Sequence, residues 1–141
     1  MSIVLLSGAL AFSQAPSESS PPVANLRQLM LDVIHPSSNE ILLLIYRGGP
    51  QDAKDWASVR RSALTLAESG SMLMARARAI DQGDWIKDAK LLADAGTAAY
   101  KAAQAQDAKA LALVPNQLDA SCTTCHKQYR PNVFPREGGS K

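Results

Sequence analysis

Apolar residues recur along most of this chain with the spacing of a helix, and they do not alternate as a half-buried strand requires. After Pro22 they follow the pattern i, i+3, i+4, i+7, i+8: Leu26, Leu29, Met30, Val33 and Ile34. Residues 52–82, 84–106 and 107–130 carry similar stripes. Ala and Leu dominate and aromatics reach only 5%, which favours helices. The pattern predicts an all-α fold, an antiparallel four-helix bundle over residues 23–131.

Proline predicts an interruption in the first of these segments. Pro36 has no backbone N–H, and it disfavours helical geometry at the residue before it. One of the polar residues 37–39 can cap a new helix, and Gly48-Gly49-Pro50 ends it. The first segment is therefore predicted as a kinked helix or a pair of helices.

The later segments have their own boundary signals. Gly83 is expected to end the second helix, and Asp84 to cap the third. The fourth segment begins near Asp107, and Pro115 should kink it or split off a short leading turn. Pro131 ends it, since proline cannot continue a helix.

The N-terminal region differs from the rest. Residues 3–12 form an apolar run followed by small residues up to Ala15, which is typical of a secretory signal peptide. The run lacks a preceding Lys or Arg, so residues 1–15 are interpreted as a truncated signal peptide, and it is too short to span a bilayer. Residues 16–22 are predicted to be a linker, and residues 132–141 a flexible tail.

Charge and composition exclude several classes of function. The chain has 15 basic and 13 acidic residues, a net charge of +2, and no basic block, which argues against nucleic-acid binding. It also lacks a serine triad pattern and paired carboxylates at meaningful spacing. We therefore expect a protein that is not an enzyme.

The sequence Cys122-Thr123-Thr124-Cys125-His126 has the form C-x-x-C-H, the attachment signature of c-type haem. Two thiols at i, i+3 share one face of a helix, where they can add to the two vinyl groups on one side of a porphyrin. His126 follows directly and can bind the iron as proximal ligand. The chain has only two cysteines, so one covalent haem with its iron would use both.

Two other interpretations of the cysteines are weaker. A redox dithiol normally follows a strand in a βαβ unit, and no such pattern is present. Structural zinc usually takes four protein ligands, and beyond Cys122, Cys125 and His126 only His35 remains. Haem attachment is therefore the favoured interpretation.

Helical segments with C-x-x-C-H near the C-terminus, here CTTCHKQYR over residues 122–130, resemble the class II cytochromes c, the group of cytochrome c′ and its low-spin relatives. The resemblance covers residues 22–131. It implies a bundle with haem near one end, a periplasmic location, and either single-electron transfer with periplasmic redox partner proteins or binding of a small gas such as NO or CO. A homodimer through the first helices is a further arrangement left open.

In this family the first helix faces the distal side of the haem, and a methionine there is the sixth ligand of low-spin members. Met30 lies on the apolar stripe of the first segment and is the predicted distal ligand. His35 is an alternative, five positions later. A third is an open site: family members often place the distal residue four positions after an arginine, and from Arg27 that residue is Leu31.

Other residues near the motif have less specific roles. Arg130 can pair with a haem propionate, because guanidinium binds carboxylate in a bidentate manner, or it can be a solvated charge at a helix end. Trp56 and Trp85 are expected in the core or in the wall of the haem pocket, and Tyr129 in the core.

Overall fold

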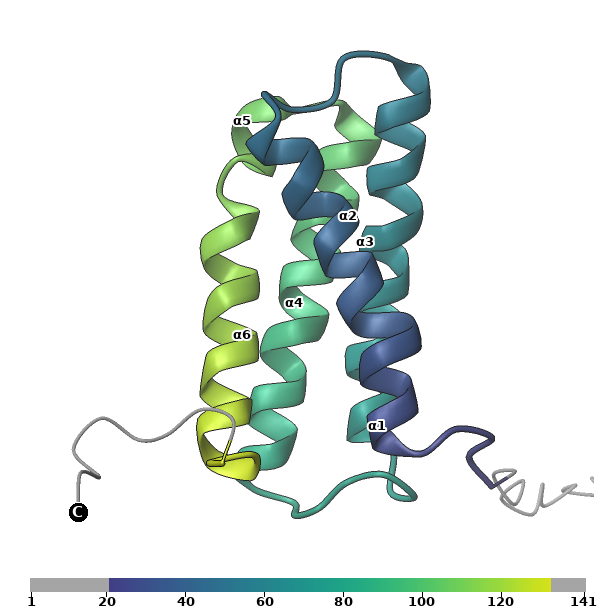
Figure 1. Cartoon of the computed structure of the whole chain (residues 1–141), viewed down its shortest axis with the longest axis vertical. Helices are drawn as coiled ribbons and strands as arrows, with labels where there is room; N and C mark the ends of the chain where they lie inside the picture. Colours follow the sequence, from purple (N-terminus) through teal and green to yellow (C-terminus); the bar gives the residue numbers. More distant parts are fainter. Residues whose placement is uncertain (1–20, 133–141) are drawn as a thin grey trace, which may run out of the picture.

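The computed structural model describes residues 21–132, and over this range it is all-helical, as predicted. The helices, in chain order, are α1 (Leu26–Leu29), the π-helical turn η1 (Met30–Ile34), α2 (His35–Tyr46), α3 (Ala53–Met74), α4 (Asp84–Ala105), α5 (Ala108–Leu111) and α6 (Val114–Tyr129). Because α1, η1 and α2 are continuous, four helical segments pack together (Figure 1). Helix α4 packs against both α3 and α6, and α2 packs against α3.

The structure leaves some sequence predictions untested. The proposed signal peptide at 1–15 lies outside the described residues, as do most of the 16–22 linker and most of the 132–141 tail. Between residues 21 and 132, no helix has the length and hydrophobicity that crossing a membrane requires.

The first helical segment is not broken at Pro36, so of the two predicted forms, a kinked helix or a pair of helices, the pair with a new cap is wrong. The chain widens into η1 instead, where the His35 N–H donates to the Met30 carbonyl five residues earlier. A π turn relieves the contact that the ring of Pro36 would make with the carbonyl of the preceding turn. The hydroxyls of Ser37 and Ser38 donate to the carbonyls of residues 33 and 34, at 2.8 and 2.7 Å, rather than capping a new helix.

Helix α3 begins where the sequence indicates but ends early. The Asp52 carboxylate caps it by accepting from the Asp55 N–H at 2.8 Å. The helix stops at Met74, not at Gly83: Ala75 adopts an extended conformation, and the chain then crosses the end of the molecule, where the Arg78 guanidinium donates to the Ala24 carbonyl at 2.8 Å.

Helix α4 is capped by a residue other than the predicted one. Asp81 accepts hydrogen bonds from the N–H groups of Gly83 and Trp85, at 2.8 and 3.1 Å, whereas Asp84 is the first helical residue. These hydrogen bonds hold the C-terminal end of the connection over residues 75–83 against the first turn of α4.

The fourth segment is divided as its proline predicts. Asp107 caps the short α5, and Pro115 lies in the first turn of α6, where its missing N–H has no intrahelical partner to lose. Helix α6 ends at Tyr129, shortly before Pro131. The cysteine motif thus occupies the last two turns of the last helix.

Small residues let α3 and α4 approach closely. A Cβ added at Gly96 would lie 2.3 Å from the Ala67 backbone nitrogen, and one at Gly70 would lie 2.5 Å from the Ala93 nitrogen. These two crossings fix α4 against α3, so α4 can present its other side to α6 and to the cysteine motif.

Candidate functional site

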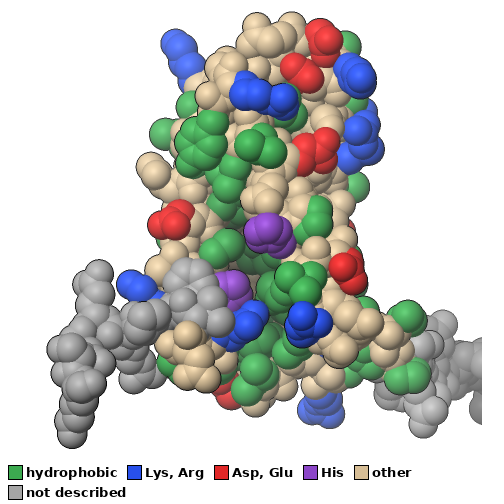
Figure 2. Space-filling view, in the orientation of Figure 1, with side chains coloured by type: hydrophobic (Ala, Val, Ile, Leu, Met, Phe, Trp, Pro, Cys, Tyr) green, Lys and Arg blue, Asp and Glu red, His purple; other side chains and the backbone are tan. Residues whose placement is uncertain are grey.

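Two adjoining cavities lie between the first helical segment and α6. The first is lined from the start of α1 and the end of α6, and the second from η1, α2, α3, α4 and α6. The start of α1 and the end of α6 both lie at the lower end of Figure 1. Their volumes are about 250 and 210 Å³. They share four lining residues: Met30, Cys125, His126 and Arg130. The two cavities therefore form one cleft between the first helical segment and α6. On the face shown in Figure 2 the surface is hollowed here, with apolar side chains inside the hollow and the two histidines beside it.

Both cysteines are half-buried, unpaired thiols on α6 that line the second cavity. Burial raises the pKa of Cys122, and it raises the pKa of Cys125 to about 11. Both groups are therefore thiols at neutral pH. A redox dithiol depends on a lowered cysteine pKa, so the environment of these two residues disfavours that chemistry.

His126 is half-buried and lines both cavities. Burial, and to a smaller extent the positive charge of Arg130, lowers the pKa of His126. The neutral imidazole, which is the form that binds a metal ion, is favoured at neutral pH.

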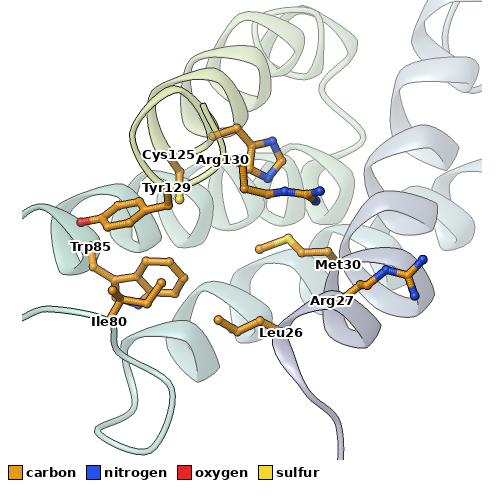
Figure 3. Close-up of a pocket in the computed structure, with 9 residues that line it drawn as sticks. Leu26, Arg27, Met30, Ile80, Trp85, Cys125, Tyr129 and Arg130 are labelled. Atoms are coloured by element: carbon orange, nitrogen blue, oxygen red, sulfur yellow. The ribbon is translucent and has the colours of Figure 1, made fainter. Parts of the chain in front are cut away.

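Met30 lies on the opposite wall of the cleft. It is the first residue of η1, it is half-buried, and it lines both cavities. Figure 3 shows its side chain reaching from the first helical segment toward the side of the cavity that carries Cys125 and Arg130. A thioether and an imidazole therefore line the same space from two different helices.

The π turn changes the position of His35. In an α-helix, residues five apart point about 140° away from each other. Here His35 lines the second cavity together with Met30, because the wider turn moves the two residues toward the same face. The His35 ring is exposed and lies 3.3 Å from the Asn39 side-chain amide. Leu31 lines the second cavity only, and 51% of it is exposed.

Aromatic residues form the inner wall of the first cavity (Figure 3). Trp85 is buried, donates from Nε1 to the Leu73 carbonyl at 2.7 Å, and meets Tyr129 edge-on with ring centroids 5.0 Å apart. The Tyr129 hydroxyl donates to Asp81, a bond that holds the pKa of Asp81 below its ordinary value. Trp85 and Tyr129 thus belong both to the packed core and to the wall of the first cavity. Trp56 packs against the core and does not line this cavity.

Two arginines stand at the rim of the first cavity. Arg27 and Arg130 are both exposed and both line it, and Arg130 also lines the second. In Figure 3 the two side chains extend to the same side of the cavity. The rim therefore offers positive charge to an anionic group of a bound ligand.

Asp88 is a cavity residue that the sequence analysis missed. It lies on α4, is only 6% exposed, and lines the second cavity near Cys122, Cys125 and His126. Its Oδ2 has no hydrogen-bond partner among the described residues. One signal was available, since Asp88 follows Trp85 by three positions and so falls on the apolar face of its helix.

The donor set fits a haem better than it fits a bare metal ion. Within residues 21–132, no three His, Cys, Asp or Glu side chains gather closely enough to hold a cation, so the four-ligand set of structural zinc is not provided there. The cleft offers instead two thiols on one helix face, an adjacent imidazole, a thioether across the gap and mainly apolar walls. Two thiols, an imidazole and a thioether are groups that could hold a covalently attached haem.

No known family model matches the chain, and neither a curated protein nor a solved structure is significantly similar to it. The function is therefore inferred from the site itself.

Proposed function

We propose that this protein is a c-type cytochrome of the class II type that transfers single electrons. One haem is bound covalently through Cys122 and Cys125, and its iron is bound by His126 on the proximal side and Met30 on the distal side. The observation that carries the proposal is that Met30 lines the same two cavities as Cys125 and His126, from the opposite helix.

The chain's own residues would bind, orient and shield the group. When bound, haem supplies an iron that alternates between ferric and ferrous states. Cys122 and Cys125 would hold the group through two thioether bonds, each formed by addition of one S–H across one vinyl group. His126 is held as a neutral imidazole, and the Met30 thioether favours reduced iron. The apolar side chains of Trp85 and Ile80 line the first cavity, and they would cover one side of the group. Arg130 is placed at the rim, where it can pair with a propionate.

The same proposal includes the antiparallel four-helix bundle of this cytochrome class. Successive long helices are joined by short connections at alternate ends of the molecule (Figure 1). Residues at the start of α1 and in the last turns of α6 line the same cavity, so a haem bound there would lie between the two ends of the described chain.

Location and partners follow from the same chemistry. Covalent haem attachment implies export, so the proposed location is the periplasm, and the partners are redox proteins there. Pairing of two chains through their first helical segments is compatible with the exposed apolar residues Leu31 and Leu43 on that segment.

The alternative of an open, gas-binding iron receives less support from the geometry. It requires Leu31, rather than Met30, to face the iron. Leu31 lines one of the two cavities and is half exposed, whereas Met30 lines both and is more deeply placed. The placement of Met30 in both cavities therefore supports the six-coordinate, electron-transferring form.

Substitutions test these assignments. The protein is exported in a host that attaches haem c, as wild type and as the variants Cys122→Ala, Cys125→Ala and Met30→Ala. Each cysteine variant should lose one of the two thioether bonds to the haem. Met30→Ala should keep its covalent haem, but its spectrum should change from low-spin to high-spin and should shift when carbon monoxide is added. Met72→Ala, which changes an exposed methionine on α3, is the matched control and should leave the spectrum unchanged. A low-spin spectrum that survives Met30→Ala refutes the distal assignment.

A further inference from the structure

Asp88 is a buried residue of the cleft whose carboxylate Oδ2 has no hydrogen-bond partner among residues 21–132. It is 6% exposed, its Oδ2 accepts no hydrogen bond from the described residues, and it lines the second cavity. The nearest lysine in sequence does not neutralise it, since the Lys87 ammonium is exposed and pairs with Asp84 at 3.0 Å. A buried carboxylate in this setting is unstable unless it gains a proton or a partner.

The surroundings of Asp88 favour its protonated form. Burial raises the pKa of Asp88, the negative charges of Asp84 and Asp81 raise it further, and Lys87 opposes them only in part. Charged or titratable groups face this region from α2, α4, α6 and the connection before α4, whereas η1 and α3 contribute only uncharged residues to the cavity, Leu73 from α3. The charged or titratable groups are Asp84 and Lys87 from α4, Asp81 from the connection, Cys122, Cys125, His126, Tyr129 and Arg130 from α6, and His35 from α2.

We propose that Asp88 couples proton binding to electron transfer: its carboxyl group takes up a proton from solvent when the haem iron is reduced and releases it when the iron is oxidised. This inference rests on the proposed function, because the electron is held by the haem. Asp88 itself belongs to α4, whereas the proposed iron ligands belong to α6 and η1.

The charge balance gives the direction of the coupling. One electron from a one-electron donor protein converts ferric to ferrous iron and removes one positive charge from the cleft. A carboxylate that loses a nearby positive charge binds a proton more tightly. One proton from water then binds to Asp88, no other bond is made or broken, and oxidation reverses both steps. By linkage, the reduction potential falls as pH rises across the interval in which Asp88 titrates.

The test compares reduction potentials of the haem-loaded protein from about pH 4 to about pH 9, a range that includes ordinary and raised carboxyl pKa values. Wild type, Asp88→Asn and the control Asp94→Asn are titrated with small-molecule redox mediators. Asp94 lies on the same helix, is exposed and pairs with Lys90, so its substitution removes a carboxyl from outside the cleft. Propionates of the haem also titrate, so the informative quantity is the difference between wild type and Asp88→Asn.

We expect a pH-dependent interval of the potential that is present in wild type and Asp94→Asn and is lost in Asp88→Asn. Redox-difference infrared spectra of wild type should show a protonated-carboxyl band that appears on reduction and is missing from Asp88→Asn. An unchanged pH profile in Asp88→Asn overturns the inference. If that variant fails to bind haem, the wild-type spectrum decides, since a missing carboxyl band on reduction also overturns it. A colourless wild-type protein would instead refute the proposed function.

Discussion

Replacement of Gly96 by alanine tests the packing that positions the cleft. The added Cβ would lie 2.3 Å from the backbone nitrogen of Ala67 and 2.8 Å from its Cα. Both atoms are backbone and cannot rotate away as a side chain does. The first distance is roughly 1 Å short of ordinary van der Waals contact, so α3 and α4 must separate along their crossing.

The magnitude follows from two opposing effects. Overpacking of a close contact costs about 1–3 kcal/mol, and a backbone contact that cannot yield belongs at the upper end of that range. Alanine recovers about 1 kcal/mol through its higher helix propensity. We therefore expect Gly96→Ala to lower the free energy of unfolding by about 2 kcal/mol, which corresponds to a fall in Tm on the order of 8 °C for a domain of this size.

The assay is urea unfolding followed by far-ultraviolet circular dichroism, with thermal unfolding as a second measure. Thr97→Ala is the matched control, because Thr97 is the next residue, is exposed, and donates only to the Ala93 carbonyl of its own helix. The control should remain within about 0.5 kcal/mol of wild type. If Gly96→Ala unfolds at the same urea concentration as wild type, or a higher one, the close approach of α3 and α4 is wrong.

Two further substitutions test interactions around the core. Glu40 accepts hydrogen bonds from Ser58 and Ser62 across α2 and α3, which lowers the pKa of Glu40. The Glu40 carboxylate therefore stabilises the fold at pH values above the ordinary glutamate pKa, and this contribution is lost as pH falls through the lowered pKa. Glu40→Gln should lower the free energy of unfolding by about 1 kcal/mol at neutral pH, a figure already discounted for the exposure of Glu40, and should not lower it in strong acid. Urea unfolding at several pH values measures this difference. Trp85→Phe removes the buried bond to the Leu73 carbonyl and should cost about 1–3 kcal/mol in thermal unfolding, and a variant as stable as wild type would contradict that bond.

The helices were predictable because burial of one face imposes a period that sequence alone shows. Leu29 and Ile34 of the first segment's stripe and Leu66 of the second segment's stripe lie in the buried core. The split at Pro115 followed from a missing N–H. The spacing of Cys122 and Cys125 likewise fixed their common side of α6, because three residues complete nearly one turn. These features depend on local geometry.

The errors arose where tertiary packing decides the outcome. The response to Pro36 was not predictable from proline chemistry, since a break and a π turn both relieve the same contact, and only the π turn keeps the first helical segment continuous. Whether His35 and Met30 lie on the same face of the first helical segment depends on whether the chain breaks or forms a π turn. The early end of α3 and the capping by Asp81 depend on how residues 75–83 cross the end of the molecule.

Asp88 was missed for a related reason. A charged residue on an apolar face is usually paired or turned outward, and sequence periodicity does not reveal whether a partner is present. The structure shows the carboxyl buried in the cleft, with its Oδ2 lacking a hydrogen-bond partner within the described part of the chain. The combination of burial, a missing partner and a cavity can be recognised only in three dimensions.

The most direct measurement is the intact mass and visible spectrum of the wild-type chain, purified after export in a host that attaches haem c. The protein should be red, heavier than its polypeptide by the mass of one haem, and unreactive toward thiol reagents at Cys122 and Cys125 after denaturation. A colourless protein of unmodified polypeptide mass, with both thiols reactive, would contradict the account.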